Sequence, residues 1–173
     1  MTTTMMPDVT SNQIAVLRDQ ARMAHVVVRM GLDGVTHEES LIQPDPAGNC
    51  LNWVVGHLLA VYDNVLPLVG QQPVLPPAAQ KRYDRGSQPI RDGSEALDIG
   101  ELMAMWDESA KRYDAGLGAL DPATLGSPAP FSPTGNPDET IGSLLSTIAF
   151  HQSYHTGQTG LLRRVVGKAG VIG

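Results

Sequence analysis

The sequence predicts an all-α protein, a single four-helix bundle with long crossover loops. Apolar residues recur at three- and four-residue steps over four segments, each of roughly 20 to 30 residues, and no segment alternates apolar and polar residues as a strand would. Stretches rich in proline and glycine separate these segments. The 173 residues suffice for one domain with a sizeable core and hardly for two. We therefore expect one domain over residues 1–173, with residues 1–10 disordered.

The composition disfavours several classes of partner. The chain has 12 Lys and Arg against 18 Asp and Glu, a net charge of −6, which is unfavourable for a nucleic-acid surface. No apolar stretch approaches the roughly 20 residues needed to span a bilayer, and the N-terminus lacks the basic and apolar regions of a signal peptide. The single cysteine, Cys50, has no partner for an internal disulfide. We expect a cytoplasmic protein that binds neither nucleic acid nor membrane.

The first helix is expected to follow Ser11, a residue type that commonly caps helices. Its apolar stripe consists of Ile14, Leu17, Ala21, Ala24 and Val28. The helix should end between Gly31 and Gly34, because glycine favours helix termination. His25, beside three arginines, and His37, in the charged loop that follows, are expected to be exposed to solvent.

The second helix is expected over residues 50–70, with Asn49 as its cap. Apolar residues lie on most of its sides, which is typical of a helix buried on most sides. Residues 71–94 contain four prolines and predict a long irregular segment with a short helical turn near residues 78–82. Long loops in compact domains often border a functional site.

The third helix should begin after Asp98, which a glutamate follows at the spacing of a capping box, and end at Asp121-Pro122. The fourth should begin after Asn136, with a proline at its first position, and end at Gly167. Four methionines are expected to fill gaps in the core: Met23, Met30, Met103 and Met105.

Two histidines, His151 and His155, lie within the apolar stripe of the fourth helix. At this spacing their Cβ atoms are roughly 6 Å apart, close enough for both rings to bind one metal ion. The alternative is that each ring is buried, neutral and hydrogen-bonded to a neighbour, and the short HxxxH pattern does not decide between the two. A third ligand is needed. His57 follows Gly56 in the middle of the second helix, but its helical angle places it to the side of the main apolar stripe.

Two strings of the sequence resemble the DinB-like superfamily. They are N-x-x-x-W-x-x-G-H-L, from Asn49 to Leu58, and F-H-x-x-Y-H-x-G-Q, from Phe150 to Gln158. The order of helices and loops is also similar over nearly the whole chain. The resemblance implies a metal-binding four-helix bundle, often a homodimer, in which one histidine of the second helix and two of the last helix hold a divalent ion.

For this chain the resemblance implies that His57, His151 and His155 are the metal ligands, whereas it implies no ligand role for Tyr154 or Gln158. Three imidazoles leave coordination positions open, as in catalytic or substrate-binding centres. Zinc and nickel are the ions favoured, and iron or manganese is also compatible. Such an ion lowers the pKa of a bound water or thiol.

Several functions are compatible with this centre. Characterised proteins that the chain resembles include thiol-dependent S-transferases, which predicts a metal-dependent transferase that activates a low-molecular-weight thiol toward a small-molecule electrophile held near residues 71–94. A metal-dependent hydrolase, a non-catalytic metal- or ligand-binding stress-response protein, and a bundle with vestigial histidines are the alternatives. Whether the protein is an enzyme stays open at this point.

Three further residues have two readings each. Trp53 and Trp106 either line a pocket or fill the core, and their stripe-compatible positions favour the core. Cys50 is either a thiol nucleophile or a small buried hydrophobe, and its place at a helix start favours the second. The broad apolar surface of the second helix, together with the resemblance, predicts a homodimer.

Overall fold

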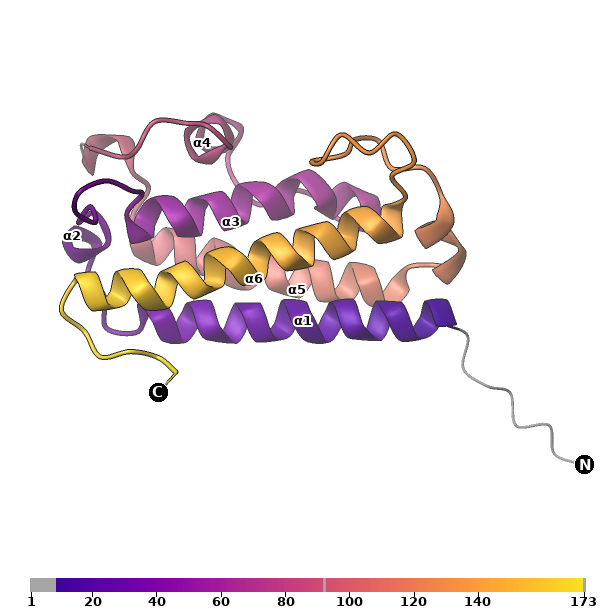
Figure 1. The fold of residues 1–173 in the computed structure, drawn as a ribbon, viewed down its shortest axis with the longest axis horizontal. Helices are drawn as coiled ribbons and strands as arrows, with labels where there is room; N and C mark the ends of the chain where they lie inside the picture. The colour runs from indigo at the N-terminus through magenta and orange to yellow at the C-terminus, as the bar shows by residue number, and fades with distance from the viewer. Residues whose placement is uncertain (1–8, 92, 173) are drawn as a thin grey trace, which may run out of the picture.

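Four long helices form the bundle seen in the computed structural model, which describes residues 9–91 and 93–172. They are α1 (Val9–Leu32), α3 (Leu51–Val65), α5 (Ile99–Ala119) and α6 (Ile141–Val165). α1 packs against α5 and α6, and α3 packs against the same two helices (Figure 1). The described residues contain no strand, only an isolated bridge between Pro128 and Thr140. The all-α fold class is confirmed.

Short helices occupy the connections between the long ones. They are α2 (His37–Ser40), η1 (Leu66–Val69), α4 (Pro77–Tyr83), η2 (Gly93–Glu95) and η3 (Pro122–Gly126). α4 confirms the helical turn expected near residues 78–82. α4 and the connection over residues 127–140 both lie on the side of the bundle formed by α3 and α6 (Figure 1). The two crossover connections therefore flank one face.

The predicted start of the last helix, after Asn136, is wrong. The side chain of Asn136 accepts the N–H of Asp138 at 3.1 Å and so closes a local turn. The helix begins four residues later with Thr140 as its cap. The Thr140 hydroxyl accepts the N–H of Ser143 at 3.2 Å, and the Ser143 hydroxyl accepts the N–H of Thr140 at 2.9 Å. This reciprocal pair satisfies two N–H groups that a helix start otherwise leaves free.

Two other helix starts also differ from the prediction. α1 begins at Val9, so Ser11 lies inside the helix and does not cap it. Residues 1–8 of the segment expected to be disordered lie outside the described residues, and Val9 and Thr10 are helical. α3 has Cys50 as its cap, without a side-chain hydrogen bond, instead of Asn49.

The predicted ends of the first and last helices and the cap of the third helix are confirmed, whereas the second helix, expected over residues 50–70, ends at Val65 and is followed by the short helix η1. α1 ends at Leu32, and Gly34 has φ 68°, a left-handed conformation that glycine adopts without strain. α6 ends at Val165, and Gly167 has φ 79°. The Asp98 carboxylate accepts the N–H of Gly100 at 2.8 Å at the start of α5.

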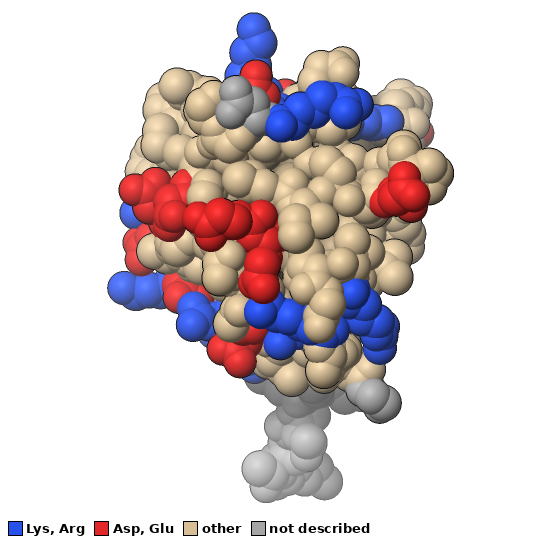
Figure 2. Space-filling view, turned by 90° about the vertical axis from the view of Figure 1, so that its left-hand side faces the viewer, with Lys and Arg blue, Asp and Glu red and all other residues tan. Residues whose placement is uncertain are grey.

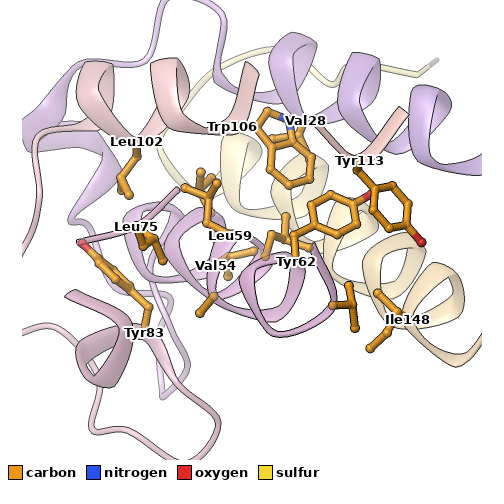
Figure 3. Close-up of a cluster of buried hydrophobic side chains, with 14 of the residues drawn as sticks. Val28, Val54, Leu59, Tyr62, Leu75, Tyr83, Leu102, Trp106, Tyr113 and Ile148 are labelled. Carbon is orange, nitrogen blue, oxygen red and sulfur yellow. The ribbon is translucent and has the colours of Figure 1, made fainter. Parts of the chain in front are cut away.

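α3 is the central helix of the core, since all but two of its 15 residues are buried. Between α3 and α5 the Tyr62 ring stacks on Trp106, with ring centroids 5.4 Å apart, and lies 4.8 Å from the ring of Tyr113 (Figure 3). This confirms that the second long helix is buried on most sides. The apolar residues on most sides of α3 are buried by other parts of the same chain, so they supply no argument for a dimer.

Two of the four methionines are outside the core, contrary to the prediction. Met23 and Met30 are 62% and 46% exposed on α1, whereas Met103 and Met105 are half-buried against the core. Methionine occurs both in protein cores and on protein surfaces. The spacing of apolar residues alone therefore did not distinguish the outer face of α1 from its inner face.

The prediction that His25 and His37 are exposed is also wrong, because both are half-buried. His25 Nε2 lies 2.8 Å from a carboxylate oxygen of Asp107, and His37 Nδ1 lies 3.8 Å from one of Asp98. Both acidic residues come from α5 or its cap. A neighbouring element therefore covers each ring.

The charged side chains are mixed on the end of the bundle where α2 lies. Figure 2 shows basic groups along the upper and lower edges of this end and acidic groups between them, so the described residues form no continuous basic surface on this face. Within the described part of the chain, no helix has the length and apolarity required to cross a membrane.

Candidate metal centre

The packing of α3 against α6 brings the three predicted histidines together. His57 lies in the middle of α3, and His151 and His155 lie one turn apart on α6. Candidate ligand nitrogens of the three rings all lie within 4.8 Å of one another. The cluster could therefore hold one metal ion.

His57 is oriented by α4. Its Nδ1 lies 2.8 Å from the backbone carbonyl oxygen of Tyr83. Since a carbonyl only accepts, Nδ1 carries the proton, and Nε2 is left with its lone pair toward the other two rings. The indole of Trp53 stacks on the ring of His57, with ring centroids 4.7 Å apart and planes 15° from parallel.

A close approach of α4 to α3 makes this contact geometrically feasible. A Cβ at Gly56 would overlap the ring of Tyr83, so only glycine lets the ring lie against α3. The Tyr83 hydroxyl donates to the side-chain oxygen of Asn52 and accepts the N–H of Leu97, both at 2.9 Å. These contacts fix the position of Tyr83 and so the carbonyl that orients His57.

His155 is oriented from within its own helix. Its Nδ1 lies 2.6 Å from the side-chain oxygen of Gln158, one turn further along α6. This contact leaves Nε2 of His155 free to bind a metal. The ring of Tyr154 lies edge-on to His155, with centroids 5.1 Å apart. The two motif residues whose roles the sequence left open thus contact one of the three histidines directly.

His151 provides a test of whether the cluster fits a metal ion. Its Nδ1 is buried and has no hydrogen-bond partner among the described residues, and its Nε2 lies 3.1 Å from Nε2 of His57. Two lone pairs at this separation repel unless a proton or a cation lies between them. Nitrogen ligands bound at about 2.0 to 2.1 Å to a tetrahedral zinc ion are about 3.4 Å apart. The spacing and the donor set fit a divalent ion.

The three rings are neutral at pH 7, which is the form that binds metal. Burial lowers the pKa of His57 and of His155, and it lowers the pKa of His151 to about 4, with the neighbouring His155 and His57 adding to the effect. Burial disfavours the charged form because it removes water from the ring.

The histidines line a cleft of about 710 Å³. Its walls come from α3, from residues 84–86 after α4, from the connection after η3, and from α6. Apolar members of the lining are Trp53, Val61, Phe131, Pro133, Ile148 and Phe150. The segment over residues 71–94 does border the site, as expected from its length.

Sequence reasoning missed the second loop that borders this cleft, residues 131–134, and also Phe150. Phe131 is 41% exposed and Phe150 is 73% exposed. Large apolar side chains left in contact with water are a signal of a binding surface, but in the sequence Phe131 stands in a proline-rich connection with no periodicity to mark it.

The structure distinguishes core residues from cleft residues among the two tryptophans and the cysteine. Trp106 is fully buried in the core, and Trp53 is both buried and part of the cleft lining. Cys50 is a buried free thiol outside that lining, in accord with its reading as a small hydrophobe.

The structure places the protein among the all-helical bundles that carry a three-histidine cluster in an open cleft. The chain belongs to the DinB superfamily, whose family model matches residues 18–159. It is similar in fold to a crystal structure described as the conserved protein of locus from Enterococcus faecalis, with a TM-score of 0.67 and 18% identity over 89% of this chain and 97% of that chain. A search of curated proteins finds no match.

Proposed function

We propose that the protein is a metal-dependent S-transferase that joins a low-molecular-weight thiol to a small electrophile. The observation that carries the proposal is the convergence of three neutral imidazoles, within 4.8 Å of one another, at the floor of an open cleft. Structural metal sites are usually closed by four protein ligands, whereas a three-ligand centre keeps a position for a substrate.

The metal ligands in this proposal are His57, His151 and His155, and zinc or nickel is the ion that an all-imidazole set favours. When bound, such an ion would lower the pKa of a thiol, so that the thiolate would be present at neutral pH. Tyr83 and Gln158 act as positioning residues because they hold the proton of His57 and of His155 on Nδ1.

The cleft would hold the electrophile against its apolar walls. The thiolate sulfur forms a bond to an electrophilic carbon, the bond to the leaving group breaks, and the leaving group departs with the electron pair. The thiol proton is released to solvent. Phe131, on the connection after η3, and Phe150, on α6, bring apolar surface to the bound molecule and displace water from it.

Metal binding is tested first, on protein purified without an affinity tag. Equilibrium dialysis with zinc and with nickel should give one ion per chain, and His57→Ala, His151→Ala and His155→Ala should each remove it. His25→Ala is the matched control, because His25 pairs with Asp107 outside the cluster and should leave the stoichiometry unchanged. Wild-type protein that binds less than about one ion per several chains would contradict the metal centre.

Transfer is tested on the loaded protein with a panel of thiols and electrophiles. Consumption of thiol with formation of the conjugate, dependent on the metal and lost in His151→Ala, is the expected result. Metal and ligand binding without any conjugate would contradict the transferase and favour the non-catalytic ligand-binding protein. Product formation by water alone, without thiol, would favour the hydrolase.

We also propose that the protein is a homodimer, as the resemblance implies. Support comes from exposed apolar side chains on the adjacent helices α1 and α6: Val16, Met23, Met30, Leu161 and Val165. Static light scattering at micromolar concentration should give twice the chain mass, and Met23→Lys should shift it toward the monomer. Lys111→Glu, a charge change on α5, is the control. A monomeric wild type would contradict the proposal.

A further inference from the structure

We propose that the cleft is built for a ligand that combines an apolar body with a carboxylate, and that Arg85 binds that carboxylate. The inference deepens the proposed function, on which it rests, by naming a chemical class of substrate. Neither the metal cluster nor the helical fold by itself requires this residue, since Arg85 belongs to the crossover connection after α4.

Arg85 lines the cleft that contains the three histidines. It lies two residues after Tyr83, whose carbonyl binds His57, and it lines the same cleft as all three rings. Its positive charge is close enough to contribute to lowering the pKa of His57 and of His151. The guanidinium therefore acts on the site electrostatically even without a ligand.

The charge of Arg85 is available to a ligand. Its backbone N–H donates to the Asp84 carboxylate at 2.8 Å, yet its side chain has no ion pair with any acidic group that the structure describes. Other arginines do pair: Arg18 with Asp114 at 2.8 Å and Arg82 with Glu95 at 3.2 Å, for example. An exposed guanidinium beside a cleft presents a planar fork of N–H donors that matches a carboxylate.

The charge balance of the cleft favours an anion. The three histidines are neutral, and the charges of Asp84 and Arg85 cancel. A divalent ion would then add two positive charges that no protein ligand compensates. A thiolate supplies one negative charge, and one carboxylate supplies the second. The carboxylate belongs either to the thiol or to the electrophile, and both sources use the same chemistry at Arg85.

The apolar part of the ligand is inferred from the apolar side chains that line the cleft. Val61, Phe131 and Phe150 line the cleft, and both phenylalanines are exposed. Binding sites typically combine a largely apolar lining with a few charged groups that orient the ligand. A hydrocarbon or aromatic body against these walls places its charged end within the same cleft as Arg85.

The first experiment measures binding without turnover. Hydrocinnamate and its uncharged amide, hydrocinnamamide, are titrated into the full chain, with and without Zn²⁺, and followed by tryptophan fluorescence, because Trp53 lines the cleft. We expect the carboxylate to bind about tenfold more tightly than the amide in both conditions. Arg85→Ala should abolish this preference and Arg85→Lys should retain part of it.

Arg91→Ala is the matched control, because Arg91 belongs to the same connection but not to the cleft lining, and it should keep the preference. Equal affinity of the wild type for the two compounds would overturn the inference. A preference that survives Arg85→Ala would also overturn it, since the carboxylate would then bind elsewhere, for instance to the zinc ion. Neither result depends on whether the protein transfers thiols.

A second experiment distinguishes the two sources of the carboxylate. One arm compares kcat/KM for mercaptopropionate and mercaptopropanol with chloromethylbenzamide as electrophile. The other compares chloromethylbenzoate with chloromethylbenzamide, with mercaptopropanol as thiol. In each reaction the sulfur–carbon bond forms as the carbon–chlorine bond breaks, chloride leaves with the electron pair, and the thiol proton goes to solvent.

The arm in which Arg85→Ala removes an approximately tenfold preference for the acid identifies the partner that carries the carboxylate. Turnover in both arms without any preference that depends on Arg85 would overturn the inference. Absence of turnover in every arm would contradict the transferase, while the binding titration still decides the role of Arg85.

Discussion

The two sides of α3 both contain stacked aromatic rings, but the stack on one side is buried in the core and the stack on the other side lines the cleft. Toward α5, Tyr62 stacks on a Trp106 side chain that is fully buried. Toward α6, Trp53 stacks on His57 at a similar separation, but this stack opens onto the cleft. One helix therefore contributes stability through one face and a site through the other.

Both sides bury polar atoms, but they differ in how these atoms are grouped. On the α5 side the Trp106 indole N–H donates to the backbone carbonyl of His25 at 3.4 Å, and the Ser109 hydroxyl oxygen is a single buried atom without a partner among the described residues. On the α6 side, Nδ1 of His151 is buried without a partner among the described residues, and three neutral rings face one another. Unsatisfied groups of this kind are costly and are characteristic of ligand sites.

The largest expected effect concerns the α5 side. Trp106→Ala should lower the free energy of unfolding by about 3 to 5 kcal/mol, because it removes a fully buried ring and leaves a cavity. Guanidinium denaturation followed by circular dichroism measures the change. Phe150→Ala, on the exposed rim of the cleft, should change it by less than about 0.5 kcal/mol. Similar losses for the two variants would abolish the distinction between the two sides.

The next effect concerns the cluster itself. Zinc at a hundredfold excess over its dissociation constant should stabilise the wild type by about 2.7 kcal/mol. His57→Ala should lose this stabilisation and should also lower the metal-free stability, because it removes a buried ring that stacks on Trp53 and leaves the carbonyl of Tyr83 without its partner. Thermal denaturation with and without zinc measures both quantities. Full zinc stabilisation of His57→Ala would show that the ion binds elsewhere.

A smaller effect is expected where α4 meets α3. Gly56→Ala should cost about 1 to 3 kcal/mol because the added methyl group overlaps Tyr83. It should also weaken zinc binding, since Tyr83 carries the carbonyl that orients His57. Urea denaturation and zinc titration measure the two changes.

The smallest effect is expected at a glycine on the open side of α6. A Cβ at Gly157 meets nothing within 4 Å, so Gly157→Ala should stabilise the protein by about 0.5 to 1 kcal/mol through helix propensity and leave zinc binding unchanged. The same denaturation and titration serve as its measurement. If Gly56→Ala behaved like Gly157→Ala, the close approach of Tyr83 would not matter for the site.

Local sequence chemistry predicted the helices well where a single residue type decides the outcome. Asp98 caps α5 because a short carboxylate accepts the free N–H groups of a helix start. Gly167 follows the end of α6 because a residue without Cβ adopts the left-handed conformation found there. Asn136 was assigned to a helix start although it closes a turn, since both uses employ the same side-chain oxygen. The burial of Met23, His25 and His37 was misjudged because neighbouring helices decide it.

The sequence by itself determined the all-α class, the family, and the three histidines as the candidate site. Those conclusions depend on periodicity and on two short strings, which are local properties of the chain. Only the tertiary structure decided that Tyr83 and Gln158 orient the rings, that residues 131–134 form a wall of the cleft, and that Arg85 stands beside it. Apart from the contact within α6, these relations join segments distant in sequence, and helix packing alone brings such segments within reach of one another.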